Sequence, residues 1–184
     1  IRFEGQHFLA DDVLNNRNWS GGKLKQVSIS GAEIADSNWE HALLENVSIH
    51  GCDATGITWP KNKAGTLTFR NSVLDSEALA HYQSRNPTRP SLEGCDARLC
   101  QIWGEDFSGY DLVGTRFPKT FKARFDNTIM DGPILEQAIE NGCRVHTVDV
   151  RGQDLRGLKL SDADLSRAKL QQAKLAGAEV DGVI

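Results

Sequence analysis

The segment from Ala163 to Gly177 consists of three blocks of five residues: Ala-Asp-Leu-Ser-Arg, Ala-Lys-Leu-Gln-Gln and Ala-Lys-Leu-Ala-Gly. Each block has a leucine at its centre and an alanine two residues earlier. The same period of five continues on both sides of this segment. In the C-terminal part of the chain, the apolar centres are Val145, Val150, Leu155, Leu160, Leu165, Leu170, Leu175 and Val180.

Two further series of apolar centres keep this period in the rest of the chain. The N-terminal series is Leu14, Trp19, Leu24, Ile29, Ile34, Trp39, Leu44, Ile49, Ala54, Trp59, Ala64, Phe69 and Leu74. The shorter series is Ala97, Ile102, Phe107, Leu112 and Phe117, with Phe125 and Met130 as a broken remainder. The residue two places before each centre is mostly small or apolar, and the other three are mainly polar, charged or glycine. The pattern predicts one large and one small inward side chain in each block.

A strict period of five fits neither an α-helix, with about 3.6 residues per turn, nor a plain β-strand, with a period of about two. It fits an extended chain that turns a corner after every five residues. Four such sides close a coil of about 20 residues, and successive coils stack through backbone hydrogen bonds roughly 4.8 Å apart. The sequence therefore predicts an all-β solenoid in which each coil contacts its neighbours.

The blocks from Ala163 to Gly177 resemble the pentapeptide-repeat family, whose consensus is close to A(D/N)LXX. The resemblance covers nearly the whole chain and implies a right-handed quadrilateral β-helix. A length of 184 residues predicts a single domain of this kind over residues 1–184, with interruptions near residues 75–95 and 118–142. The family implies little about function, because proteins that share a fold serve many roles.

The first interruption contains an expected short helix over residues 76–85. Asp75 or Ser76 is suited to cap its N-terminus, and Asn86-Pro87 is expected to stop it. Residues 88–91 then read as a loop.

The second interruption, residues 131–142, also reads as a helix. Pro133 fits the first helical position and Gly142 fits the C-terminal cap. An apolar stripe on this helix is expected to dock against the solenoid; it consists of Ile134, Leu135, Ala138 and Ile139.

Three of the four tryptophans, Trp19, Trp39 and Trp59, are spaced by the length of one coil. They are expected to form an inward column of stacked indoles. The alternative is an outward aromatic strip, which would suit sugar or nucleic-acid binding. Four cysteines occupy the small inward position, where a thiol packs as a small hydrophobe: Cys52, Cys95, Cys100 and Cys143. The sequence alone does not decide whether Cys95 and Cys100 form a disulfide.

The candidate partner-binding residues are Tyr82, Arg85, Arg89 and Trp103. The first three belong to the interruption that contains the first expected helix, and loops on a rigid scaffold often carry function. Trp103 directly follows the inward position of Ile102, so the period places it outside. It is expected either to anchor a partner or to pack under the insertion of residues 75–94.

The composition excludes several classes of function. The formal net charge is −4, so we do not expect the chain to coat a nucleic acid. The sequence has no run of 18 apolar residues and no motif of a phosphate loop, nucleophile elbow or zinc protease. We therefore expect no membrane span, no catalysis, no metal and no cofactor.

We expect a non-enzymatic protein-interaction scaffold or targeting domain. The resemblance implies that it belongs to a larger bacterial protein, such as a secreted effector, because some members of this family are parts of such effectors. The alternative is a DNA-mimicking protein that binds gyrase or another topoisomerase. The near-neutral charge of residues 1–74 and 143–184 argues against that alternative. Without a signal peptide the expected location is the cytoplasm, or delivery by a secretion route that needs none.

The ends of the stack raise a separate expectation. The last coil, residues 163–182, presents four apolar centres at an open end. A second copy pairing end to end, or a following domain, is expected to cover them, and the missing initiator methionine favours a fragment. At the other end, Ile1, Phe3 and Phe8 fall outside the later register and are expected to fold over the first coils as a plug.

Overall fold

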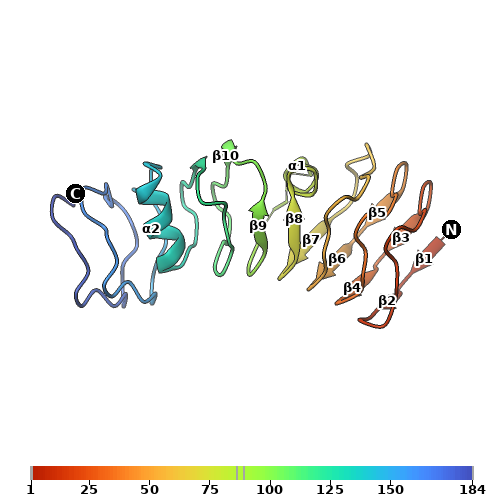
Figure 1. Ribbon diagram of the computed structural model, residues 1–184, viewed down its shortest axis with the longest axis horizontal. Helices are drawn as coiled ribbons and strands as arrows, with labels where there is room; N and C mark the ends of the chain where they lie inside the picture. Colours follow the sequence, from red (N-terminus) through yellow and green to blue (C-terminus); the bar gives the residue numbers. More distant parts are fainter. Residues whose placement is uncertain (1, 86, 89, 184) are drawn as a thin grey trace. The chain divides into compact units, whose positions relative to one another are not determined.

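The computed structural model describes residues 2–85, 87–88 and 90–183. The chain divides into two compact units, residues 1–100 and residues 101–184. In both units short extended segments from successive coils lie side by side in parallel (Figure 1).

The described residues of unit 1 form nine short strands and one helix. Its strands are β1 (Arg2–Glu4), β2 (His7–Phe8), β3 (Lys23–Lys25), β4 (Ser28–Ser30), β5 (Leu43–Glu45), β6 (Val47–His50), β7 (Leu67–Arg70), β8 (Val73–Asp75) and β9 (Asp96–Leu99). They form three parallel sheets in the orders β1-β3-β5, β2-β4-β6-β7 and β8-β9. Leu24 pairs with Leu44, and Ile29 pairs with Ile49, which confirms the predicted spacing of one coil.

Unit 2 contains β10 (Trp103–Asp106), β11 (Lys122–Arg124) and one helix. Elsewhere its coils meet at isolated parallel bridges rather than at longer strands, and these bridges again join residues 20 apart: Asp149 with Lys169, Asp154 with Lys174, and Lys159 with Glu179. The fold is therefore the predicted solenoid of short β-segments.

Phe125 and Met130 are full members of the core of unit 2, and their interpretation as a broken remainder was wrong. Both side chains are at most 1% exposed. The amide of Phe107 donates to the carbonyl of Arg124, so Phe125 lies in the same column as Phe107 although it follows by 18 residues instead of 20. The coil is two residues shorter, and this shift hides the period in the sequence.

Ala64 is the one exception in the N-terminal series, because its side chain is exposed rather than inward. Residues 61–66 are all exposed and form a loop between the buried Pro60 and the buried Leu67. Alanine at a central position buries little apolar surface. The loop is held instead by hydrogen bonds to its backbone, described below.

The N-terminal phenylalanines continue the stack instead of folding over it. Phe3 pairs with Leu24 and Phe8 pairs with Ile29, each one residue out of the later register. Both rings contact Trp19, at centroid distances of 5.0 and 5.8 Å. Ile1, the third residue of the expected plug, lies outside the described residues.

The two expected helices are present. In unit 1, α1 spans Ser76–Gln83, with Asp75 as its N-cap, and ends two residues earlier than expected. In unit 2, α2 spans Gly132–Glu140, with Asp131 as its N-cap and proline in its first turn. The expected stop of α1 at Asn86 falls outside the described residues. On the apolar stripe of α2, three of the four side chains are buried: Ile134, Leu135 and Ala138.

The column of tryptophans is confirmed, but its rings are tilted rather than stacked, with interplanar angles of 42° and 59°. The centroids of Trp19 and Trp39 are 6.2 Å apart, and those of Trp39 and Trp59 are 5.5 Å apart. Trp39 donates to Ser37, whose hydroxyl in turn donates to the carbonyl of Ile34. The four cysteines have free thiols, and three of them are buried: Cys52, Cys95 and Cys100.

Burial in the core falls toward the last coil of unit 2. Leu160 is fully buried and Leu165 is 7% exposed, whereas Leu175 is 42% and Val180 is 51% exposed. The apolar centres of the last coil are thus increasingly open to solvent. Neither helix in the described part of the chain is long and apolar enough to cross a membrane.

Candidate protein-binding site

Tyr82 lies inside unit 1, where it closes the contact between α1 and the coils. Its ring is 1% exposed and meets the edge of Phe69 at a centroid distance of 5.8 Å. The hydroxyl donates to the carbonyl of Ser91 and accepts from its amide. Burial raises the pKa of the Tyr82 hydroxyl. These contacts leave no surface of Tyr82 for a partner.

Arg85 is also engaged within unit 1. Its Nη1 donates to the carbonyl oxygens of Ala64 and Gly65, at 2.8 and 3.1 Å, and its Nη2 donates to that of Asn62 at 3.3 Å. The guanidinium therefore holds the exposed loop that replaces one side of the coil. Planar guanidinium groups present several donors in a fixed geometry, which suits a cluster of carbonyls.

His81 connects this clamp to the tryptophan column. Its ring stacks on Trp59 at 4.9 Å with an interplanar angle of 17°, and its Nε2 accepts from Nε of Arg85. Burial, with smaller effects of the charges of Arg85 and Lys63, lowers the pKa of His81 to about 4. The imidazole is neutral near pH 7. Nothing in the pentapeptide pattern indicated this cluster, because His81 belongs to an insertion outside the repeat.

Trp103 is the one predicted site residue that is exposed in the described chain. Its side chain is 76% exposed, so it points outward and is not packed beneath other residues. It begins β10, where it pairs in register with Lys122 of β11. Arg89 lies outside the described residues. The predicted residues do not form one cluster, since Tyr82 and Arg85 belong to unit 1 and Trp103 belongs to unit 2.

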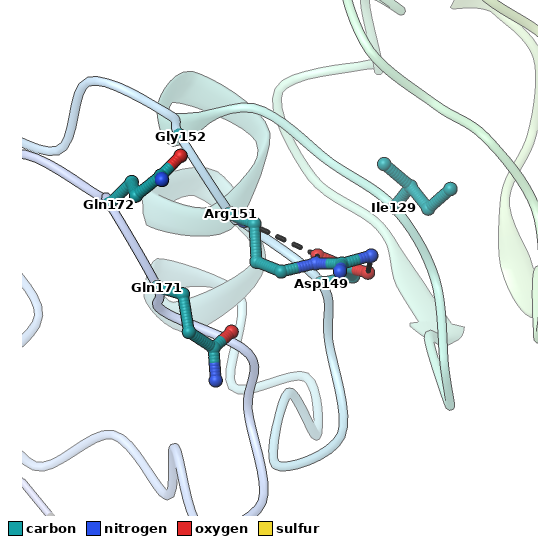
Figure 2. Close-up of a pocket in the computed structure, with 6 residues that line it drawn as sticks. All are labelled: Ile129, Asp149, Arg151, Gly152, Gln171 and Gln172. Atoms are coloured by element: carbon teal, nitrogen blue, oxygen red, sulfur yellow. Dashed lines mark hydrogen bonds and ion pairs between the residues drawn. The ribbon is translucent and has the colours of Figure 1, made fainter.

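Unit 2 also has a surface groove that the repeat pattern did not predict. It encloses about 450 Å³ and is lined by Ile129, Asp149, Arg151, Gly152, Gln171 and Gln172; we call it the Arg151 groove. Figure 2 shows the Arg151 guanidinium against Asp149, between Ile129 on one side and Gln171 on the other. Parallel bridges join Ile129 to Asp149, and Asp149 to Lys169, so three successive coils build the groove.

A recessed carboxylate forms the base of this groove. The Asp149 side chain is 7% exposed and accepts from Nε and Nη2 of Arg151 at 2.8 and 2.7 Å. Nζ of Lys169 lies 3.6 Å from the same carboxylate. The hydrogen bond from Arg151 is the main cause that lowers the pKa of Asp149. One carboxylate with two cations gives this triad a net charge of about +1 at neutral pH.

The same arrangement recurs on the next side of the coil. Asp154 accepts from Nε and Nη2 of Arg156, and it bridges through its backbone to Lys174. The Arg156 hydrogen bond is the main cause that lowers the pKa of Asp154 to about 2. Arg151 and Arg156 are 57% and 58% exposed, so the cationic groups face the solvent.

The chemistry of these surfaces suits recognition. Within the described residues, no group of three or more His, Cys, Asp or Glu side chains could hold a metal ion. Burial raises the pKa of the Cys95 thiol to about 11, so this thiol is protonated and a poor nucleophile. The groove itself offers an apolar side chain, one guanidinium group and two side-chain amides, and the Lys169 ammonium group lies beside its carboxylate.

The sequence contained a signal for the groove that the repeat analysis passed over. Ile129 directly precedes the inward Met130 and so occupies an outward position, yet it is apolar and 40% exposed. An apolar residue at an outward position of a repeat is the kind of irregularity that marks a contact surface.

The geometry defines the class of protein as a β-solenoid assembled from five-residue sides. The model of the pentapeptide-repeat family matches residues 148–184, in eight copies. The match covers the C-terminal repeats and confirms the resemblance to this family that the sequence predicted.

Solved structures with some likeness to this chain are also pentapeptide-repeat proteins. One is HetL, involved in heterocyst differentiation regulation in the cyanobacterium Nostoc sp. strain PCC 7120, with 19% identity, coverage of 97% of this chain and 87% of that chain, and a TM-score of 0.36. Another is QnrB1, a plasmid-mediated fluoroquinolone resistance protein, with 17% identity, coverage of 100% and 88%, and a TM-score of 0.30. A comparison with curated proteins gives no match in sequence.

Proposed function

We propose that this chain is a non-enzymatic protein-interaction scaffold or targeting domain within a larger bacterial protein of the secreted-effector kind. The observation that carries the proposal is the exposure of Trp103 on a strand of unit 2. Tryptophan is enriched among the residues that dominate binding energy at protein interfaces. A large exposed aromatic side chain on a hydrogen-bonded strand also loses little entropy when a partner covers it.

The full chain, used as bait in affinity capture, tests the role of Trp103. A specific partner should be retained by the parent chain and lost with Trp103→Ser. Val13→Ser is the matched control, because Val13 is an apolar residue that is 54% exposed in unit 1. Failure to capture any specific partner, or equal capture by Trp103→Ser and the parent chain, would refute the proposal.

The alternative function, DNA mimicry toward gyrase or another topoisomerase, requires a dense array of unpaired negative charge. Several aspartates of this chain are instead neutralised by an arginine two residues later, as in Asp96 with Arg98 and Asp149 with Arg151. This pairing favours the scaffold. A supercoiling assay with micromolar protein separates the two roles, since the scaffold predicts no effect on gyrase.

We propose that the protein works in the cytoplasm, or after delivery by a route without a signal peptide. The free, buried thiols are compatible with a reducing compartment. Fractionation of cells that express the tagged full-length protein tests this location.

A further inference from the structure

We propose that the Arg151 groove binds an extended acidic peptide of a partner protein, with an apolar side chain on Ile129 and carboxylates toward Arg151 and Lys169. The inference rests on the proposed role in protein binding, but it concerns a surface that does not include Trp103.

The first support is local charge. Residues 101–184 carry 11 Lys and Arg against 13 Asp and Glu, so unit 2 is negative as a whole. The groove and the adjacent set around Asp154 are positive instead. Here two aspartates are accompanied by four basic side chains: Arg151, Arg156, Lys169 and Lys174. Because the aspartates are engaged by these cations and remain ionised, the surplus positive charge persists near neutral pH and attracts an anionic partner.

The second support is the arrangement of chemically different groups along the groove. Along the stack, Asp111 bridges to Ile129, Ile129 to Asp149, and Asp149 to Lys169. The surface therefore runs from Asp111 through the apolar Ile129 to Asp149, whose charge is outweighed by Arg151 and Lys169. A polymer of uniform negative charge, such as a nucleic acid, would meet Asp111 at one end. A peptide with an apolar residue before its acidic residues complements the whole sequence of groups.

The third support is unused hydrogen-bonding capacity. Within the described part of the chain, the side-chain amides of Gln171 and Gln172 make no hydrogen bond, and Nη1 of Arg151 is not needed for its pair with Asp149. Figure 2 shows both glutamines on the side of Arg151 that faces away from Ile129. Side-chain amides both donate and accept, which matches the alternating donors and acceptors of an extended peptide backbone.

Fluorescence anisotropy with labelled decapeptides and the full chain tests the inference. The first peptide carries one leucine followed by three glutamates, the second has glutamines in place of the glutamates, and the third has the glutamates before the leucine. The first peptide should bind best, and its affinity should fall as ionic strength rises. An oligonucleotide of equal charge should bind more weakly than the first peptide.

Variants on both sides of the groove make the test specific. Ile129→Ser and Lys169→Gln should each weaken binding of the first peptide by about three- to tenfold. Both leave the Asp149–Arg151 pair intact, so circular dichroism should report an unchanged fold. Lys119→Gln, a change of an exposed cation outside the groove, should have no effect on affinity.

The outcomes separate this inference from the proposed function. Equal affinity for the acidic and glutamine peptides, stronger binding of the oligonucleotide, or full binding by Ile129→Ser and Lys169→Gln would overturn the groove as a peptide site. Trp103→Ser should leave peptide binding unchanged. If a partner is captured through Trp103 while no peptide binds, the proposed function stands and the inference about the groove is wrong.

Discussion

Each five-residue block needs a particular backbone at its corner, two residues after the central side chain. The amide of the third residue after the centre donates to the central carbonyl, as Ala168 does to Leu165 at 2.9 Å. In most blocks the residue just before that donor has positive φ, and glycine often occupies the position. Where it is not glycine, the residues are Asn16, Gln26, Asp36, His41, Asn46, Asn71, Asn127, Asp162, Arg167 and Gln172. The left-handed conformation explains the many Gly, Asn and Asp residues there.

An Asp or Asn side chain supports the same corner from the residue before the centre. Oδ1 of Asp164 accepts from the amide of Ser166, and Oδ1 of Asn38 accepts from the amide of Glu40. Such side chains hydrogen-bond to the backbone two residues on and thereby favour turns. The second position of the family consensus thus has a direct physical role.

Gly157 isolates the cost of the corner backbone. It has φ of +71°, and a Cβ placed there meets nothing within 4 Å. Gly157→Ala should lower the free energy of unfolding by about 1 kcal/mol, because only the left-handed backbone is penalised. Gly157→Asn should cost less, since asparagine tolerates this conformation. Urea denaturation measures both, and equal stability of the alanine variant would contradict the interpretation.

His81 makes the stability of unit 1 depend on pH. The folded protein holds its pKa at about 4, below the ordinary value of 6.5. Between these two pH values His81 is protonated in the unfolded chain but neutral in the folded chain. The free energy of unfolding therefore falls as the pH drops from about 6.5 to about 4. Above pH 6.5 both states are neutral at this residue, and the penalty vanishes.

Denaturation curves at several pH values across that window test this dependence. His81→Phe keeps a ring on Trp59 but cannot be protonated, so its stability should vary less with pH than that of the parent chain. The same slope in both proteins would show that His81 is not responsible.

At the scale of the element, one aspartate caps the N-terminus of each helix and also accepts a hydrogen bond from the neighbouring coil. Asp75 accepts from the amide of Ala78 in α1 and from that of Gly56 in the coil. In α2, Asp131 is the N-cap in the same way. Its two oxygens accept from the amides of Ile134 and Gly114. Two insertions with unrelated sequences are thus attached by the same device, which combines helix capping with a tertiary hydrogen bond.

Asp131→Ala should therefore destabilise unit 2 by about 1–2 kcal/mol, through loss of the cap and of the tie to the coil. Asp131→Asn should retain part of this stability, because its amide oxygen still accepts one bond. Asp181→Ala controls for the change in charge and should alter stability by less than about 0.5 kcal/mol. Thermal denaturation followed by circular dichroism compares the three variants, and a neutral Asp131→Ala would exclude the proposed tie.

At the scale of the whole molecule, the stack has a gradient of burial toward its last coil. In a solenoid each coil contacts only its neighbours, so a core side chain stabilises according to how many coils cover it. Leu155 is fully buried, Leu165 is 7% exposed and Leu175 is 42% exposed.

Truncation of these leucines should reproduce the gradient. Leu155→Ala should cost about 2–5 kcal/mol, whereas Leu175→Ala should cost below about 1 kcal/mol, with Leu165→Ala between them. Leu165→Asp should cost more than Leu165→Ala, because it buries a carboxylate without a partner. Chemical denaturation measures the series, and equal costs at Leu155 and Leu175 would mean that the last coil is covered in solution.

The sequence by itself determined the repeating parts of this protein. A period of five places the same side chains inward in every coil, because the corner geometry is local and is repeated by each block. The tryptophan column, the four cysteine positions and the starts of both helices followed from spacing and capping residues alone. The outward position of Trp103 followed from the same period.

Only the tertiary structure decided the parts where contacts between distant segments replace the repeat. Arg85 could bind a partner or hold a loop, and its hydrogen bonds to residues 62–65 settle this choice. Ala64 is exposed because Arg85 holds its loop through backbone hydrogen bonds. Phe125 is buried in the core because its coil is two residues shorter. The Arg151 groove depends on side chains from three coils whose distances no local pattern specifies. Burial and charge at such places result from long-range packing, which the period of a sequence does not encode.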